Sequence, residues 1–275
     1  MFAVSPFTPV FFSPSKDRYG ASCRYMQVFA PADHIFVQVI TMSETREIVG
    51  GIRDLSNDQV FTIPWKVWSM NSDDKLYYYV ITGIKEGYYT LIINDSESEP
   101  FHITTDEHEL AQTTLIQYSM KDNRQRKDGV FWVSDTQYFF DFRAPGGFKD
   151  DNWIFGVSNE QFMTAGDELA EVYSTESTQK QFTLGNSLGC PVWFGELLNR
   201  IMSCSYVYFD GERYVRKDSG VPEITQSIEA QRSYIFKILL QCTNIIDYIE
   251  SDNLMKIRRV DESQYRNVSS KLLMI

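Results

Sequence analysis

The chain has 275 residues, of which 43% are hydrophobic and 23% charged, and it carries a formal net charge of -11. This composition is typical of a folded globular protein rather than a disordered chain, and the length allows about two domains. Because nucleic-acid binding depends on clustered Lys and Arg, the acidic balance argues against nucleic acid as a main partner. Aromatic residues make up 15% of the chain, and they favour β-strands.

The first 20 residues are apolar but contain three prolines and no basic start. They are therefore a poor secretion signal, and we expect them to form a Pro-rich N-terminal arm. No stretch approaches the roughly 20 apolar residues that cross a bilayer, so no membrane span is predicted. We expect the protein to be made and assembled in a cytoplasm.

Residues 21–105 alternate apolar and polar side chains in short runs that are separated by Gly, Asn and Asp. This pattern predicts an antiparallel sandwich of immunoglobulin-like size. The predicted strands are YMQVFA, HIFVQVI, QVFTIPW, KLYYYVI, YYTLII and PFHIT. The acidic segment 104–112 is the predicted junction to the next domain.

Residues 106–243 are expected to form a β-rich α+β domain. The strand predicted at 138–143 should end at Pro145, Gly146 and Gly147. A glycine pair of this kind can also bind phosphate, but only before a helix, and the following KDDNWIFGVSNEQF has no helical apolar period. We therefore interpret the glycine pair as a turn.

The best predicted helix is CPVWFGELLNRIMSC, which places Trp193, Leu197 and Ile201 on one packed face. After it, SYVYFDGERYVRK predicts a hairpin whose turn is Asp210-Gly211, since both turn positions require positive φ. YIFKILLQ is the last predicted strand. Residues 244–275 are a mixed C-terminal tail that could reach a neighbouring subunit or fold back.

GNSLG at 185–189 matches the GxSxG nucleophile elbow and lies between a predicted strand and a predicted helix. An elbow serine needs a histidine that follows it in the chain, and the last histidine is His108. We therefore interpret Gly185 and Gly189 as structural turns, with Ser187 as a helix cap and a serine hydrolase as the remote alternative. Cys190 is interpreted as a buried thiol rather than a reactive one.

Other candidate sites are weak. The four cysteines and three histidines form no metal-binding spacing, and the pair Asp150-Asp151 lacks a calcium-loop pattern. No catalytic residue, cofactor or metal is therefore predicted. Aromatic strands place Tyr77, Tyr78 and Tyr79 on both faces of a sheet, so we expect an exposed aromatic surface that could bind glycans or protein.

Several motifs in a fixed order resemble structural proteins of phages and prophages of Bacteroidetes, including crAss-like phages. They are EGYYTLII, SEPFHI, FDFRAPGGF and TLGNSLGCPVWFGELLNRIMSCSYVYFDGERYVR followed by PEI, within about residues 75–240. The chain departs from the family pattern at Ala144 and in its tail after 243. Because of the tail, the resemblance leaves the exact position in the particle open.

The resemblance implies a non-enzymatic virion component of the tail, neck ring or baseplate, assembled in the host bacterial cytoplasm. Its partners would be copies of itself in a symmetric ring or tube and neighbouring tail or portal-proximal proteins. Arg143, Asp150 and Asp151 are the residues expected to contact other subunits. A glycan-binding or adhesive β-protein is the alternative.

Overall fold

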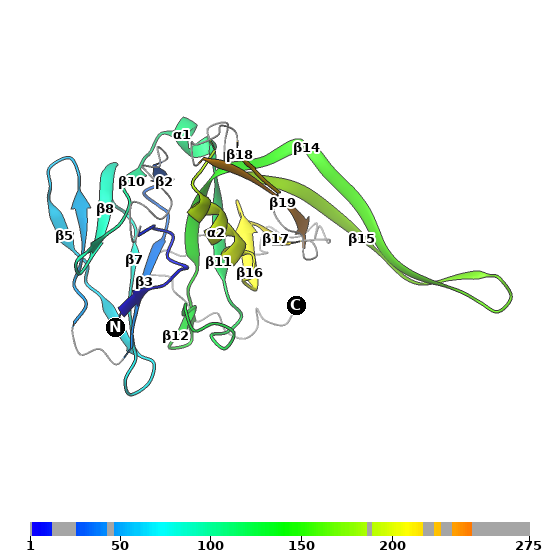
Figure 1. The fold of residues 1–275 in the computed structure, drawn as a ribbon, viewed down its shortest axis with the longest axis horizontal. Coiled ribbons are helices and arrows are strands. Elements are labelled where there is room, and N and C mark those ends of the chain that lie inside the picture. The colour runs from blue at the N-terminus through cyan, green and yellow to red at the C-terminus, as the bar shows by residue number, and fades with distance from the viewer. Residues whose placement is uncertain are drawn as a thin grey trace, which may run out of the picture.

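The residues that the structure describes are mainly β, with three larger sheets and two short helices among them (Figure 1). The fold is described from a computed structural model. The described residues are 2–12, 26–42, 47–185, 189–216, 223–226 and 233–243.

Two sheets form the N-terminal half of the described chain. The first has the order β1-β3-β7-β6, with β1 at Phe2–Val4, β3 at Ile35–Thr41, β7 at Lys75–Ile81 and β6 at Lys66–Ser69. The second has the order β2-β10-β8-β4-β5, with β9 paired to β8. Its strands are β2 (Gln27–Phe29), β10 (Phe101–Ile103), β8 (Gly87–Ile93), β4 (Gly50–Asp54), β5 (Val60–Thr62) and β9 (Ser96–Glu97).

One hydrophobic core lies between these two sheets. Val37 and Ile81 from the first sheet pack with Phe29, Leu91 and Phe101 from the second, and all are buried. Because side chains alternate across a strand, the other face of the first sheet carries a second apolar set. This sheet is therefore a middle layer, since Phe36, Ile40, Leu76 and Val80 belong to the core of the C-terminal half.

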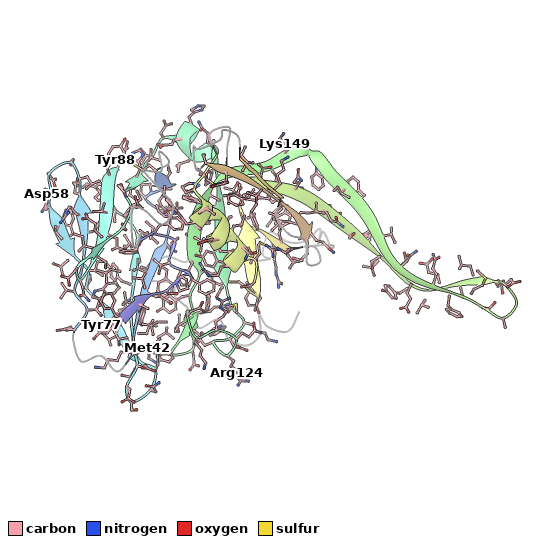
Figure 2. All side chains as sticks on the ribbon, in the orientation of Figure 1. Met42, Asp58, Tyr77, Tyr88, Arg124 and Lys149 are labelled. Carbon is pink, nitrogen blue, oxygen red and sulfur yellow. The ribbon has the colours of Figure 1, made fainter. Side chains whose placement is uncertain are left out.

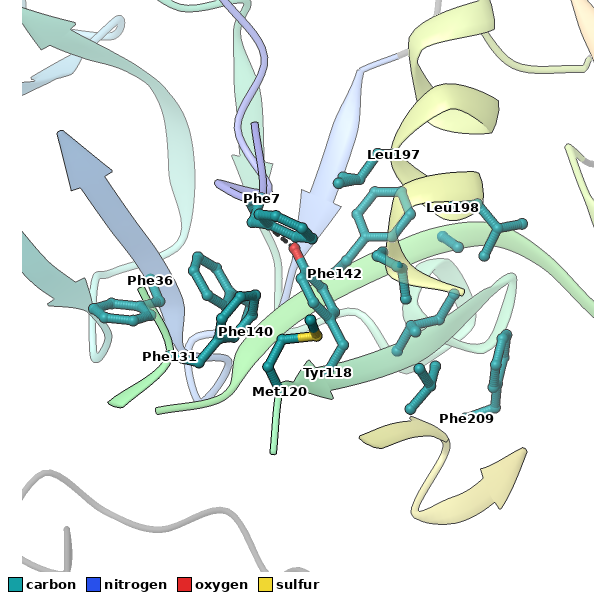
Figure 3. Close-up of a cluster of buried hydrophobic side chains, with 14 of the residues drawn as sticks. Phe7, Phe36, Tyr118, Met120, Phe131, Phe140, Phe142, Leu197, Leu198 and Phe209 are labelled. Atoms are coloured by element: carbon teal, nitrogen blue, oxygen red, sulfur yellow. Dashed lines mark hydrogen bonds between the residues drawn. The ribbon is translucent and has the colours of Figure 1, made fainter. Parts of the chain in front are cut away.

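The N-terminal segment belongs to the body of the protein. Strand β1 pairs with β3, and Phe7 is fully buried among Tyr118, Phe131 and Phe140. The phenol of Tyr118 donates a hydrogen bond to the Phe7 carbonyl (Figure 3). For residues 2–12, the prediction of a separate arm is therefore wrong, whereas residues 13–25 and 244–275 lie outside the described residues.

The third sheet has the order β15-β14-β11-β16-β17-β19-β18, and β15 also pairs with β19, so the sheet closes on itself. Its strands are β11 (Thr113–Ser119), β14 (Phe140–Met163), β15 (Leu169–Leu184), β16 (Tyr206–Phe209), β17 (Glu212–Arg216), β18 (Glu223–Gln226) and β19 (Tyr234–Cys242). The remaining elements are a small hairpin of β12 (Trp132–Val133) and β13 (Thr136–Gln137), with helices α1 (Glu107–Ala111) and α2 (Val192–Ile201).

Helix α2 packs against aromatic side chains of this sheet. Its side chains Phe194, Leu197, Leu198 and Ile201 are buried, and Phe194 contacts Phe142 of β14. The interface follows from the sequence, because apolar residues recur at spacings of three and four along the helix. Trp193, predicted on the packed face, is half-buried there.

Strand β14 runs through Pro145, Gly146 and Gly147 without interruption and continues to Met163. The predicted strand end at the glycine pair is therefore wrong. Gly146 has a φ of +119°, and a Cβ at that position would lie 2.0 Å from the Thr183 carbonyl oxygen of β15. Gly146 therefore lets the two strands approach closely inside a sheet, and its positive φ is one that residues with a side chain rarely adopt.

Candidate functional site

The most distinctive surface of the described chain is the outer part of the β14–β15 hairpin. We call residues 153–178 the arm. The pairing of β15 with β19 ends at Gln179, and beyond it only β14 and β15 pair with each other. Figure 1 shows the arm as a twisted ribbon that stands away from the body. Its paired part, from Trp153 to Met163, is roughly 35 Å long at the usual rise per strand residue.

Large apolar side chains of the arm are exposed to solvent (Figure 2). The most exposed is Phe155, at 77%, whereas the aromatic residues of the body core are almost fully buried. The exposed set consists of Trp153, Ile154, Phe155, Val157, Phe162, Met163, Leu169, Val172 and Tyr173. The arm thus concentrates apolar surface on a two-stranded ribbon. An isolated ribbon of two strands is only marginally stable in water.

One face of the arm carries a continuous apolar row. Trp153, Phe155 and Val157 occupy alternate positions of β14 and therefore share a face. The rings of Trp153 and Phe155 are nearly parallel, at 7°, with centroids 6.1 Å apart. The ammonium of Lys180 lies 3.7 Å from the centroid of the Trp153 ring, a cation–π contact at the root of the row.

The arm is also acidic. Residues 153–178 contain five carboxylates and no Lys or Arg; the carboxylates are Glu160, Asp167, Glu168, Glu171 and Glu176. Four of them lie between residues 160 and 171, on both sides of the turn at the tip. This part of the arm is therefore complementary in charge to basic surfaces.

The inner end of β14 is held to the N-terminal half by a buried ion pair. Arg143 Nε donates to Asp33 Oδ2 at 2.5 Å, and Nη2 donates to Asp33 Oδ1 at 3.2 Å. Arg143 and Asp33 are 8% and 1% exposed. The prediction that Arg143 contacts another subunit is therefore wrong, because its guanidinium is used within the chain.

Asp141, two residues earlier on β14, is buried beside this pair. Its carboxylate accepts hydrogen bonds from the His34 backbone N–H at 2.9 Å and from Gln117 Nε2 at 2.9 Å. Burial raises the pKa of Asp141, and the nearby charge of Asp33 raises it further. These contacts tie the start of β14 to the His34 backbone and to β11.

A second charged feature lies on the body. We call residues 121–128, between β11 and β12, the basic loop; it contains four basic and two acidic residues. Asn123 holds it by accepting from the backbone N–H groups of Phe131 and Trp132. Arg126 forms an ion pair with Asp128 at 2.6 Å. The other three basic side chains, Lys121, Arg124 and Lys127, are exposed.

A small surface cleft of about 320 Å³ lies next to the basic loop. Arg126, Glu196, Asn199, Arg200 and Ser203 line it, and they come from the loop and from α2 and its C-terminal end. Both charge signs are present at its wall. The cleft therefore extends the polar surface of the loop.

The tyrosines predicted to be exposed are not. Tyr77 is buried in the core between the two N-terminal sheets. Tyr78 packs against Phe36 and Tyr138 of the other core, and Tyr79 is half-buried. The prediction of an exposed aromatic surface at 77–79 is wrong because sheets cover both faces of β7.

The predicted turns lie as follows. Asp210 and Gly211 have φ of +49° and +89° and join β16 to β17, so a hairpin turn is present there. Gly185 and Gly189 also have positive φ, of +91° and +73°. Gly147 lies within β14 and has no positive φ.

The remaining candidates give no assembled catalytic group in the described chain. Cys190 is buried at the start of the α2 segment, while Ser187 lies outside the described residues. His102 stacks on Tyr88 and contacts Glu109 at 3.2 Å. Asp150 and Asp151 are backbone positions of β14 at an irregularity in its pairing.

The arm was missed in the sequence, although a signal for it exists. WIFGV and LAEVYST are β-prone runs on either side of TAGDE, which contains the turn residues Gly166 and Asp167. Asp167 has a φ of +58°, as a tight connection requires. The glycine pair at 146–147 was interpreted as the end of the strand, and this concealed the continuation.

Among the described residues, no group of three or more His, Cys, Asp or Glu side chains could hold a metal ion. None of the described helices is long and apolar enough to cross a membrane. Comparison of the chain with protein-family profiles, with curated proteins and with solved structures found no match.

Proposed function

We propose that this protein is a non-enzymatic structural subunit of a phage particle, in the tail, neck ring or baseplate, and that it assembles with other subunits through surface contacts. The observation that carries the proposal is the arm, because it presents its largest apolar side chains to solvent at a distance from the body. Exposed apolar surface of this extent is typical of protein interfaces. The particle type rests on the resemblance of several motifs to structural proteins of Bacteroidetes phages.

The proposal includes a finer assignment of the N-terminal half as an immunoglobulin-like sandwich. Two sheets around one core support this assignment. The middle sheet of this half also packs against the C-terminal core. The two halves would then move as one unit during assembly.

The test is the protein composition of purified particles. Particles banded on a density gradient should contain peptides of this chain in constant ratio to the major structural proteins, and the ratio should persist after a salt wash. An abundant host enzyme serves as the contamination control. Recovery of the chain only in the soluble fraction would overturn the proposal.

A glycan-binding role is the second candidate, and one feature of the arm favours it. Trp153 and Phe155 form a flat aromatic strip, which is the kind of surface on which sugar rings stack. Binding on a glycan array that is lost in Phe155→Ala, but retained in the body variant Tyr88→Ala, would support this role. An array without signal would remove it.

A further inference from the structure

We propose that the arm of one subunit docks on a second copy of this chain, with its acidic tip on the neighbour's basic loop. The inference rests on the proposed function only in that both require self-association. It adds which two surfaces of the chain meet, and which of them carries the negative and which the positive charge.

A ribbon of two strands has no core of its own, so the side chains on its faces need another surface to bury them. The arm carries nine exposed large apolar residues over 26 positions. Figure 1 places it beyond the sheets of its own body. The surface that covers it in the assembled state is therefore expected to come from another molecule.

Charge decides between two ways in which copies of the chain could meet. If the arms of two subunits met, the five carboxylates of one arm would face the five of the other, and neither arm has a basic side chain. Like charges facing each other oppose association. Contact between two arms is therefore disfavoured.

Arm against body brings opposite charges together. The basic loop is fixed by the Asn123 contacts, so its cations are presented by an ordered segment. Three of its basic side chains are exposed, whereas Arg126 is held by Asp128. Three exposed cations on one loop match the four carboxylates that lie near the tip of the arm.

The resulting contact is heterologous, because two different surfaces of the same chain meet. Such a contact repeats from one subunit to the next and gives a closed ring or an open filament. The contact should also weaken with salt, since ion pairs at a protein surface are screened.

Photocrosslinking of the full-length chain tests which surfaces meet. Met163, which is exposed near the tip, is replaced by the photocrosslinker p-benzoylphenylalanine, and unlabelled chain is mixed with ¹⁵N-labelled chain before irradiation. Mass spectrometry then identifies each cross-linked peptide and whether it joins two copies. Mixed-isotope cross-links from position 163 to the peptide containing residues 121–128 are the expected result.

Every other pattern overturns the inference. Mixed-isotope cross-links between two arms would show contact of like surfaces. Cross-links confined to one copy, including any to residues 244–275, would show that the arm is covered by its own chain. Absence of a cross-link to another copy, at concentrations where the chain self-associates, would exclude the arm from the contact.

Charge-reversal variants test the same contact independently, with the self-association constant measured by sedimentation. Reversal of Glu160, Glu168 and Glu171 to Lys should lower the self-association constant roughly tenfold, because each exposed ion pair contributes modestly. Reversal of Lys121, Arg124 and Lys127 to Glu should do the same. The two sets combined in one chain should restore association, since the signs are again opposite.

The matched control reverses three exposed carboxylates outside the arm to Lys, namely Asp73, Glu99 and Glu107. It changes the net charge by the same amount as the arm variant and should leave association within about threefold of the unmodified chain. Equal weakening by this control would overturn the inference. The chain could still be found in purified particles in that case, so the docking inference and the proposed function fail separately.

Discussion

Replacement of Arg143 by Met should destabilise the protein more than any change of a surface charge. The guanidinium forms two hydrogen bonds to Asp33, at 2.5 and 3.2 Å, and both residues are buried. Removing one partner of a buried ion pair leaves the other charge without compensation, at a cost of about 3–5 kcal/mol. The total stability of a domain is about 5–15 kcal/mol, so the loss should be large in relative terms.

The assay is urea unfolding at pH 7, followed by both tryptophan fluorescence and circular dichroism so that coincidence of the two transitions can be checked. Arg124→Met is the control, since Arg124 is exposed on the basic loop. The double variant Arg143→Met with Asp33→Asn should recover most of the loss. The Asn oxygen can still accept from the Ala30 N–H, which is 2.7 Å from the carboxylate in the unmodified protein.

A loss below about 1 kcal/mol in Arg143→Met, equal to that of the control, would contradict a buried and coupled ion pair. Such a result would place the pair in solvent rather than between the two halves of the molecule. Additivity of the two substitutions would contradict such a coupled pair as well, because residues in direct contact should show a coupling energy in a double-mutant cycle.

Three other outcomes follow from the structure. Gly146→Ala should cost at least about 2 kcal/mol, since a positive φ combines with a clash against the Thr183 carbonyl. Gly166→Ala, where a Cβ would lie in ordinary contact 4.0 Å from Thr164 Oγ1, should change little in the same urea assay. Burial raises the pKa of Asp141 above its unfolded value near 3.9, so stability should fall as pH rises from about 4 through the folded pKa. Asp141→Asn should remove part of that fall. Burial raises the pKa of the Cys204 thiol to about 12, so iodoacetamide at pH 8 should alkylate it far more slowly than a free cysteine, as read by peptide mass spectrometry.

The local signals in the sequence were reliable where the chemistry of one short stretch decides the structure. The Asp210-Gly211 pair lies at a hairpin turn because two consecutive positive-φ positions select such residues. Leu197 and Ile201 are buried on α2 because a helix brings positions four apart to one face. Alternation along the strands likewise indicated a mainly β protein.

The errors concern features that depend on distant parts of the chain. Alternation in LYYYVI shows that the tyrosines face opposite sides of a strand, but it does not show that a sheet covers each side. Arg143 resembles a surface cation in the sequence, and only the fold brings Asp33, 110 positions away, against it. Burial of a polar group depends on which partner the tertiary structure supplies.

The β class, the helix and the tight hairpin turn follow from the amino-acid sequence, because they depend on side-chain period and on local backbone preferences. Whether the glycine pair at 146–147 ends a strand or lies within one depends on contacts with a distant part of the chain. Pairing with β15 satisfies the backbone of β14 beyond Gly147 and carries it outward as the arm. That pairing joins residues up to 38 positions apart, and no local pattern specifies it.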